Sequence, residues 1–301
     1  MNMKQFKYVL VLASTGSFGK AAEALDISQP SLSQYIKKIE QQVGMELFDR
    51  TGGNVRLTDA GRIYVDAGRK ILDLEHQMQS RISDVAAYKT GSVIVGTSPY
   101  RSAGMLPAVV KRFRKQYPGM QVMVEEMTTD ELLEATEHGQ FDICLTVLPI
   151  DDRLFDYEKI MEEELVLAVP ISYPEFVVTN QKERKYPAID AGQMNHGSFI
   201  MLKEGQAMQK ALNNLCVDKN LELNRVAVVK SLEAQIAMVR AGVGMAFVPA
   251  GVNQFCSNDE VRFYSLTQEL PKREVVVIWR KDRQLNQATK DMIDMMKDIQ
   301  W

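Results

Sequence analysis

The chain has 301 residues, of which 46% are hydrophobic and 25% are charged, and it carries a formal net charge of −3. Such a composition is that of a globular protein with room for one small and one larger domain, or for three small ones. No apolar run approaches the ~20 residues of a membrane helix, and the N-terminus lacks a signal-peptide pattern. We therefore expect a cytoplasmic protein without membrane association.

The uneven distribution of charge keeps nucleic acid among the possible partners. Residues 1–62 contain eight Lys/Arg and six Asp/Glu, whereas the remaining residues contain 28 against 33. A chain that is acidic overall can still bind DNA through a local basic patch. Because Cys144, Cys216 and Cys256 follow no metal-ligand spacing, the sequence predicts no metal site, and we expect no cofactor.

The first 60 residues predict three short helices. The first ends at residues 15–17, and Ser17 is placed to cap the second helix by accepting a backbone N–H. Pro30 suits the start of the third helix, where its missing N–H costs nothing. Apolar residues of this third helix recur at intervals of 4, 3 and 4, so that one face is buried: Leu32, Ile36, Ile39 and Val43.

This arrangement is a helix-turn-helix whose third helix would read base edges in the major groove. Hydroxyl and amide side chains on its polar face can donate to and accept from bases. The lysines farther along would contact phosphates and set affinity rather than sequence. An arginine in the following loop would reach the flanking backbone. The predicted DNA-binding residues are Gln29, Pro30, Ser31, Ser33, Gln34, Lys37, Lys38 and Arg50.

The stretch from Phe6 to Gly61 resembles the N-terminal winged helix-turn-helix of LysR-type transcriptional regulators. Its matching pieces are Gly16-Ser17-Phe18, Ala21-Ala22, Leu25, Ser28-Gln29-Pro30-Ser31-Leu32-Ser33, Ile36, Leu47-Phe48-Asp49-Arg50 and Leu57-Thr58-Asp59-Ala60-Gly61. The family often has arginine where this chain has Gln34. Arginine favours guanine and glutamine favours adenine, so we expect a different base preference.

A long helix is predicted to follow this winged helix-turn-helix domain, which we assign to residues 1–58. The helix begins after Thr58, and the segment 59–89 contains no proline. Apolar residues form a near-heptad seam typical of a helix packed against a partner helix: Ala60, Tyr64, Ala67, Ile71, Leu74, Met78, Ile82 and Val85. Burial against the chain's own next domain is the alternative. The resemblance implies a dimer linker, and in many members dimers pair into a homotetramer.

The sequence pattern changes in residues 90–301, where apolar strand-like runs alternate with helical patterns. This order predicts βαβ units, a parallel sheet and an α/β domain. We expect two lobes joined by two crossings, near residues 162 and 267. Lobe 1 would take residues 91–162 and 268–301, and lobe 2 residues 163–267. The resemblance implies a two-lobed effector-binding domain like that of periplasmic binding proteins.

Polar residues follow several of these strands, at the edge where ligands of such sheets bind. The resemblance implies a co-inducer cleft there and carries over Ser98, Thr128, Thr146 and the turn at Gly205 by position. Arg101 is this chain's own feature, and a guanidinium there would suit a carboxylate or another anion. The predicted effector-binding residues are Ser98, Tyr100, Arg101, Thr128, Thr129, Thr146, Gly205, Gln206 and Phe247.

The function predicted from the sequence is a DNA-binding transcriptional regulator that a small molecule modulates. The expected partners are double-stranded promoter DNA, a small co-inducer and a second copy of the chain, with RNA polymerase as a further candidate. The alternative is a solute-binding protein in which the two lobes alone work. An enzyme is not expected, because no nucleophile–base pair, phosphate loop or metal cluster stands out in the sequence.

Overall fold

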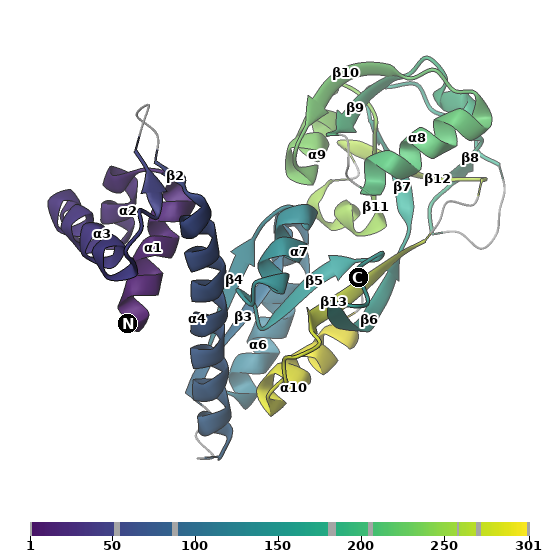
Figure 1. Ribbon diagram of the computed structural model, residues 1–301. Coiled ribbons are helices and arrows are strands. Elements are labelled where there is room, and N and C mark those ends of the chain that lie inside the picture. The colour runs from purple at the N-terminus through teal and green to yellow at the C-terminus, as the bar shows by residue number, and fades with distance from the viewer. Residues whose placement is uncertain are drawn as a thin grey trace.

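The computed structural model describes residues 2–50, 55–85, 90–179, 185–203, 207–257, 259–268 and 272–299. It has three parts (Figure 1). A small helical domain at the N-terminus lies on one side of a single long helix, α4. The first lobe of an α/β domain lies on the other side of α4, and the second lobe lies beyond the first. The long helix is thus the only regular element that joins the N-terminal domain to the lobes among the described residues.

The N-terminal domain is three helices and a two-stranded wing. Its elements are α1 (Met3–Thr15), α2 (Phe18–Ala24), α3 (Gln29–Val43), β1 (Phe48–Asp49) and β2 (Arg56–Leu57), with the two strands paired antiparallel. Phe6, Leu12, Leu32 and Phe48 meet in one core. This confirms the predicted helix-turn-helix.

The caps of the second and third helices differ in how they are made. Ser17 stands at the N-cap of α2 as predicted, but its side chain makes no capping hydrogen bond. Ser28 caps α3, because its hydroxyl accepts from the backbone N–H of Ser31 at 3.3 Å. The expected bond at Ser17 is therefore wrong, and only the position of the cap was predicted.

Helix α4 (Asp59–Val85) presents different faces to different neighbours. Thr58 starts it by accepting from the Gly61 N–H at 3.0 Å. Tyr64, Val65 and Gly68 face the N-terminal domain, where a Cβ on Gly68 would meet the Phe6 ring at 2.9 Å. Asp73 faces lobe 1.

The predicted partner seam is divided between two of these faces. Ala60, Tyr64 and Ile71 pack in the chain's own N-terminal core, so neither a partner helix nor the next domain covers them, and both predictions are wrong for these three residues. Apart from Val85, whose side chain lies outside those described, the remaining seam residues lie together with Ile63 on one exposed stripe, because spacings of 4, 7, 4 and 4 return to one side of a helix. This stripe is Ile63, Ala67, Leu74, Met78 and Ile82.

Lobe 1 is a five-stranded sheet in the order β4-β3-β5-β13-β6. Strand β3 pairs parallel with β4 and β5, but β13 pairs antiparallel with both β5 and β6. The prediction of a parallel sheet is therefore wrong for half of it, since the chain returns to lobe 1 from its far end. The strands are β3 (Thr90–Thr97), β4 (Gly119–Glu126), β5 (Ile143–Val147), β6 (Phe155–Glu163) and β13 (Arg273–Arg280).

Helices cover both faces of this sheet. On one face α6 and α10 bury Phe113, Met292 and Met296 against it, so the methionines of the last helix are core residues. On the other face α7 buries Leu132 against Cys144. The helices of lobe 1 are α5 (Pro99–Gly104), α6 (Leu106–Gln116), α7 (Thr129–Glu137) and α10 (Gln287–Lys297).

Lobe 2 has a four-stranded sheet, β11-β7-β12-β8, and a parallel pair, β10-β9. An isolated bridge between Phe199 and Met245 connects the two. Its elements are β7 (Leu165–Pro170), β8 (Ala188–Ile189), η2 (Ala191–Met194), β9 (Ser198–Leu202), α8 (Ala207–Lys219), β10 (Asn224–Val229), α9 (Leu232–Arg240), β11 (Ala246–Pro249), η3 (Ala250–Phe255) and β12 (Val261–Leu266). The chain crosses between the lobes where β6 leads into β7 and where β12 leads to β13.

A buried ionic network fixes α4 to lobe 1. The Asp73 carboxylate, 2% exposed, accepts from Arg280 Nη1 at 3.0 Å and from Arg283 Nη1 at 2.8 Å. Arg283 also donates to the Asp142 carboxylate and to the Phe141 carbonyl. Gly139 makes room for the Asp73 carboxylate, because a Cβ at position 139 would lie 2.5 Å from Asp73 atoms. The linker and the lobe are therefore held together by charge pairs whose shared carboxylate is almost fully buried.

None of the helices in the described ranges is both long and apolar enough to cross a membrane.

Candidate DNA-binding surface and effector cleft

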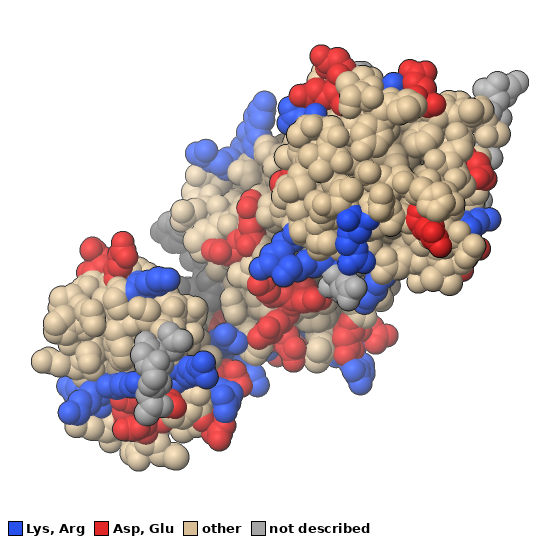
Figure 2. Space-filling view, turned by 90° about the horizontal axis from the view of Figure 1, so that it is seen from above, with Lys and Arg blue, Asp and Glu red and all other residues tan. Residues whose placement is uncertain are grey.

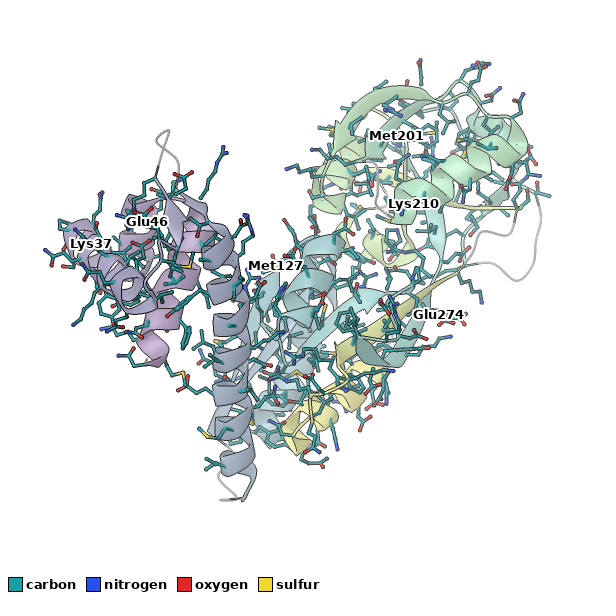
Figure 3. All side chains as sticks on the ribbon, in the orientation of Figure 1. Lys37, Glu46, Met127, Met201, Lys210 and Glu274 are labelled. Carbon is teal, nitrogen blue, oxygen red and sulfur yellow. The ribbon has the colours of Figure 1, made fainter. Side chains whose placement is uncertain are left out.

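The third helix separates a buried apolar face from an exposed polar one. Leu32, Ile36 and Ile39 are at most 1% exposed. On the other side Gln34, Lys37 and Lys38 are exposed, as are Gln29, Pro30 and Ser31 at the start of the helix, while Ser33 is half-buried. Lys37 lies on the outer side of α3, away from α4 (Figure 3). The structure thus places the predicted reading residues together on one accessible face of one helix.

Arg50 is engaged within the protein rather than extended. Its Nη2 lies 2.7 Å from Glu40 Oε2, and its guanidinium lies 5.3 Å from the centre of the Phe18 ring. The side chain remains 43% exposed, so it can still meet a phosphate. The Glu40 carboxylate also accepts from the N–H groups of Leu47 at 2.9 Å and Phe48 at 3.2 Å. Glu40 therefore holds the start of the wing against α3.

The basic side chains of the N-terminal domain are clustered, although the net charge of the domain is small. Figure 2 shows many of its Lys and Arg side chains in a band, with Asp and Glu both beside this band and at a separate place. Arg56, on β2, is exposed like the lysines of α3. A band of basic side chains beside a reading helix suits a DNA backbone that carries one negative charge per about 1.7 Å of helix axis.

In lobe 1, three predicted effector residues meet at one edge of the sheet. Thr97 pairs in register with Glu126 on β4 and with Leu145 on β5. Ser98 follows Thr97 directly, Thr146 follows Leu145, and Thr128 lies two residues after Glu126. The carboxyl ends of the parallel strands therefore bring their polar side chains together, as expected for a doubly wound sheet.

Lobe 2 brings a positive charge toward this edge of the sheet. Glu131 accepts from the Thr128 hydroxyl at 2.6 Å and from its N–H at 2.9 Å, and these donors lower the pKa of Glu131. Lys230, which follows β10, lowers that pKa further from the other lobe. Thr129 is exposed at the start of α7. Charged groups of both lobes thus face each other at the strand ends.

Tyr100 and Arg101 are buried where the lobes meet. The Tyr100 ring packs in the lobe 2 core with Val166 and Ile236, and its edge faces Phe255 at 6.1 Å between ring centres. Arg101, with 8% of its side chain exposed, donates to Glu163 Oε2 at 3.0 Å. An effector would therefore compete with Glu163 for this guanidinium.

The structure overturns one predicted cleft residue and leaves two others undecided. Phe247 is buried in the lobe 2 core on the side of α8 and does not wall the cleft. Side chains alternate along a strand, and its neighbours Ala246 and Val248 lie on the side that contacts Tyr100. Gly205 and Gln206 lie outside the described residues.

Four further residues were not predicted, and they differ in the signal they leave. Glu40 stands next to Ile36 on the apolar face of α3, and a carboxylate at such a position indicates a buried partner. Asp73, Glu163 and Arg273 have their partners 62 or more residues away. No local sequence pattern predicts a contact between residues so far apart in the chain.

A winged helix-turn-helix joined by a long helix to two α/β lobes defines a class, the DNA-binding regulators that carry their own sensor domain. Two family models divide this chain in the same way. Residues 3–62 match the model described as bacterial regulatory helix-turn-helix protein, lysR family, and residues 86–300 match the LysR substrate binding domain. The chain belongs to the LysR family of transcriptional regulators, which combine a DNA-binding domain with an effector-binding domain.

Relatives and solved structures resemble the chain along its full length. It is 29% identical over 312 residues to the HTH-type transcriptional regulator YcgK of Bacillus subtilis, covering 99% of this chain and 94% of that protein. It is 26% identical over 300 residues to the hydrogen peroxide-inducible genes activator of Haemophilus influenzae, covering 99% and 97%. CbnR, a LysR family transcriptional regulator, has a similar fold with a TM-score of 0.70, 22% identity and coverage of 99% and 98%.

A structure of CbnR bound to its target DNA is similar as well, with a TM-score of 0.69, 22% identity and coverage of 99% of both chains. The family is one of transcriptional regulators rather than enzymes. Because the helix-turn-helix match covers residues 3–62, a solute-binding protein made of the lobes alone does not describe this chain.

Proposed function

We propose that the chain binds promoter DNA as a homodimer, with α3 of each copy in a major groove, and that a small acidic effector between the lobes alters this binding. The observation that carries the proposal is the exposed polar face of α3. The buried apolar face of the same helix holds this polar face toward solvent. Gln34 and Ser33 would contact base edges, and Lys37, Lys38 and Arg50 would contact phosphates.

The effector is a small anion, with a carboxylate as the first candidate. It would bind at the ends of β3, β4 and β5, where Ser98 can donate its hydroxyl hydrogen, while the Thr128 hydroxyl already donates to Glu131. Arg101 lies behind them, with its Nη1 3.5 Å from the Ser98 hydroxyl. Binding can shift the protein only if the effector has a different affinity for two arrangements of the lobes. RNA polymerase is the partner through which the DNA-bound form would act on transcription.

The effector site is tested by the thermal stability and DNA affinity of the full chain in a screen of small carboxylates and amino acids. We expect at least one acid to raise the melting temperature and to change the affinity for promoter DNA from the protein's own locus. Ser98→Ala should weaken both responses, while Ser14→Ala, an exposed serine of α1, should leave them intact. A screen in which no acid stabilises the protein would remove the acidic effector from the proposal.

The dimer is tested on the exposed stripe of α4. Leu74, Met78 and Ile82 are 54–63% exposed although they are apolar, and pairing with the same stripe of a second copy would cover them. Leu74→Glu together with Met78→Glu should give a monomer by sedimentation. Operator affinity should then fall by two orders of magnitude or more, since one reading helix remains per molecule. Val217→Glu, at an 80% exposed valine of α8, is the control that should remain a dimer.

A further inference from the structure

The point where the chain passes between the lobes holds more positive than negative charge. Glu163 is the last residue of β6, and Arg273 is the first of β13, so each marks one of the two crossings. Figure 3 labels Glu274, the residue after Arg273, at the start of β13. Arg101 reaches the same carboxylate from α5. Two guanidinium groups therefore share one carboxylate where the chain crosses between the lobes.

This cluster is shielded from water. The side chains of Glu163, Arg101 and Arg273 are 2%, 8% and 15% exposed. Arg101 Nη2 donates to Glu163 Oε2 at 3.0 Å, and the Tyr100 hydroxyl lies 3.4 Å from Oε1. Arg273 Nη1 is 3.2 Å from Oε2 but does not have the geometry of a hydrogen bond. The Glu163 carboxylate thus forms a hydrogen-bonded ion pair with Arg101, but it interacts with Arg273 through charge alone.

Several donors of the two arginines have no acceptor. Arg101 Nε, Arg273 Nε and Arg273 Nη1 are buried without a hydrogen-bond partner among protein atoms. Burial lowers the pKa of Arg273 to about 10, with the like charge of Arg101 acting in the same direction. A buried charge is costly unless it is paired with an opposite charge and hydrogen-bonded. The cluster therefore lacks one negative charge with acceptor atoms.

We propose that this cluster is a binding site for a small monovalent anion, a halide or a short carboxylate, held by Arg101 and Arg273 beside Glu163. Such an anion would neutralise the excess charge and accept from the free guanidinium N–H groups. Because the site includes residues of both crossings and of α5, its occupation would stabilise one arrangement of the lobes. This anion site rests on the proposed function only because it treats the two lobes as the sensor domain.

The test measures the melting temperature of the full chain without DNA, as chloride, formate or acetate replaces gluconate at constant ionic strength. Gluconate is too bulky for a buried site and keeps screening constant. The chain should gain about 2–4 °C at saturating anion, and the comparison of chloride with the two carboxylates shows which kind the site prefers. Arg240→Met, which removes an exposed arginine of lobe 2, should show the same gain.

Two substitutions should change the response in opposite directions. Arg273→Met removes the excess charge at similar volume and should abolish the gain. Glu163→Gln removes the competing carboxylate, so it should lower the melting temperature in gluconate and bind the anion roughly tenfold more tightly. Equal responses of all variants, or no response of the unmodified chain, would overturn the site. Neither result would bear on operator binding, which is measured separately.

Discussion

Replacement of Glu40 by alanine is expected to detach the wing and to abolish specific DNA binding. The Glu40 carboxylate is 9% exposed and accepts from two backbone N–H groups and from Arg50. Without this carboxylate two buried backbone N–H groups lose their acceptor, at about 1–3 kcal/mol each, whereas Arg50 is 43% exposed and can turn to water. Because α3 and the wing share this contact, the loss would act on the reading surface as well as on the stability of the domain.

Thermal unfolding of the N-terminal domain and operator affinity measure this effect together. Glu40→Gln should fall between the unmodified chain and Glu40→Ala, since the amide oxygen can still accept from a backbone N–H but carries no charge. Glu46→Ala is the matched control, because Glu46 is exposed on the same domain (Figure 3). If Glu40→Ala unfolded and bound DNA like this control, the wing would not depend on Glu40.

Replacement of Asp73 by alanine is expected to free α4 from lobe 1. Asp73 is the acceptor that α4 contributes to the network with Arg280 and Arg283. Its loss should cost about 3 kcal/mol, at the low end for a broken buried pair, because Arg283 keeps Asp142 and Arg280 keeps Asp282. The lobe would then be tied to the linker mainly by the covalent chain.

Hydrogen–deuterium exchange of α4 and the strand end at Arg280 checks this second prediction. Both segments should exchange faster in Asp73→Ala, and an effector that alters DNA binding in the unmodified chain should lose that influence. Asp59→Asn provides the comparison, since Asp59 lies on the same helix but is 92% exposed and pairs, among the described residues, only with Arg62 of that helix. Unchanged exchange, with the effector response intact, would show that the network does not couple the lobe to the linker.

Local patterns were sufficient to predict the N-terminal domain but not the partners of the linker. The spacing of Leu32, Ile36 and Ile39 identifies α3, because one helix face must be buried whatever lies against it. The same reasoning treated Tyr64 and Leu74 as one seam. The structure assigns Tyr64 to the chain's own core and leaves Leu74 exposed. Periodicity shows that a face is apolar, but it does not show which surface covers it.

The lobes show a second limit of sequence patterns. Strand β6 was not predicted, because only its two ends are buried and its middle is rich in charged residues. The antiparallel pairing of strand β13 depends on the return of the chain from lobe 2, which no local pattern indicates. Phe247 was assigned to the wrong face, since an apolar run such as β11 is buried on both sides and gives no sign of which residues face the cleft.

The polar residues of the predicted cleft are a mixed case. The common location of Ser98, Thr128 and Thr146 could be predicted, because the ends of parallel strands meet at one edge, whereas their role in binding an effector stays a prediction. Arg101 was expected to serve an acidic effector on chemical grounds alone. Its ion pair with Glu163 depends on tertiary structure, so the competition for this guanidinium could be recognised only from the fold.

The most direct measurement is the selection of DNA sites from a random pool by the unmodified chain and by Gln34→Arg. If α3 reads base edges through position 34, the preferred base there should change from adenine to guanine in each half-site, with a discrimination of about 1–3 kcal/mol. The other positions and the half-site spacing should stay the same. An identical set of selected sites for both proteins would contradict the assignment of α3 as the reading helix.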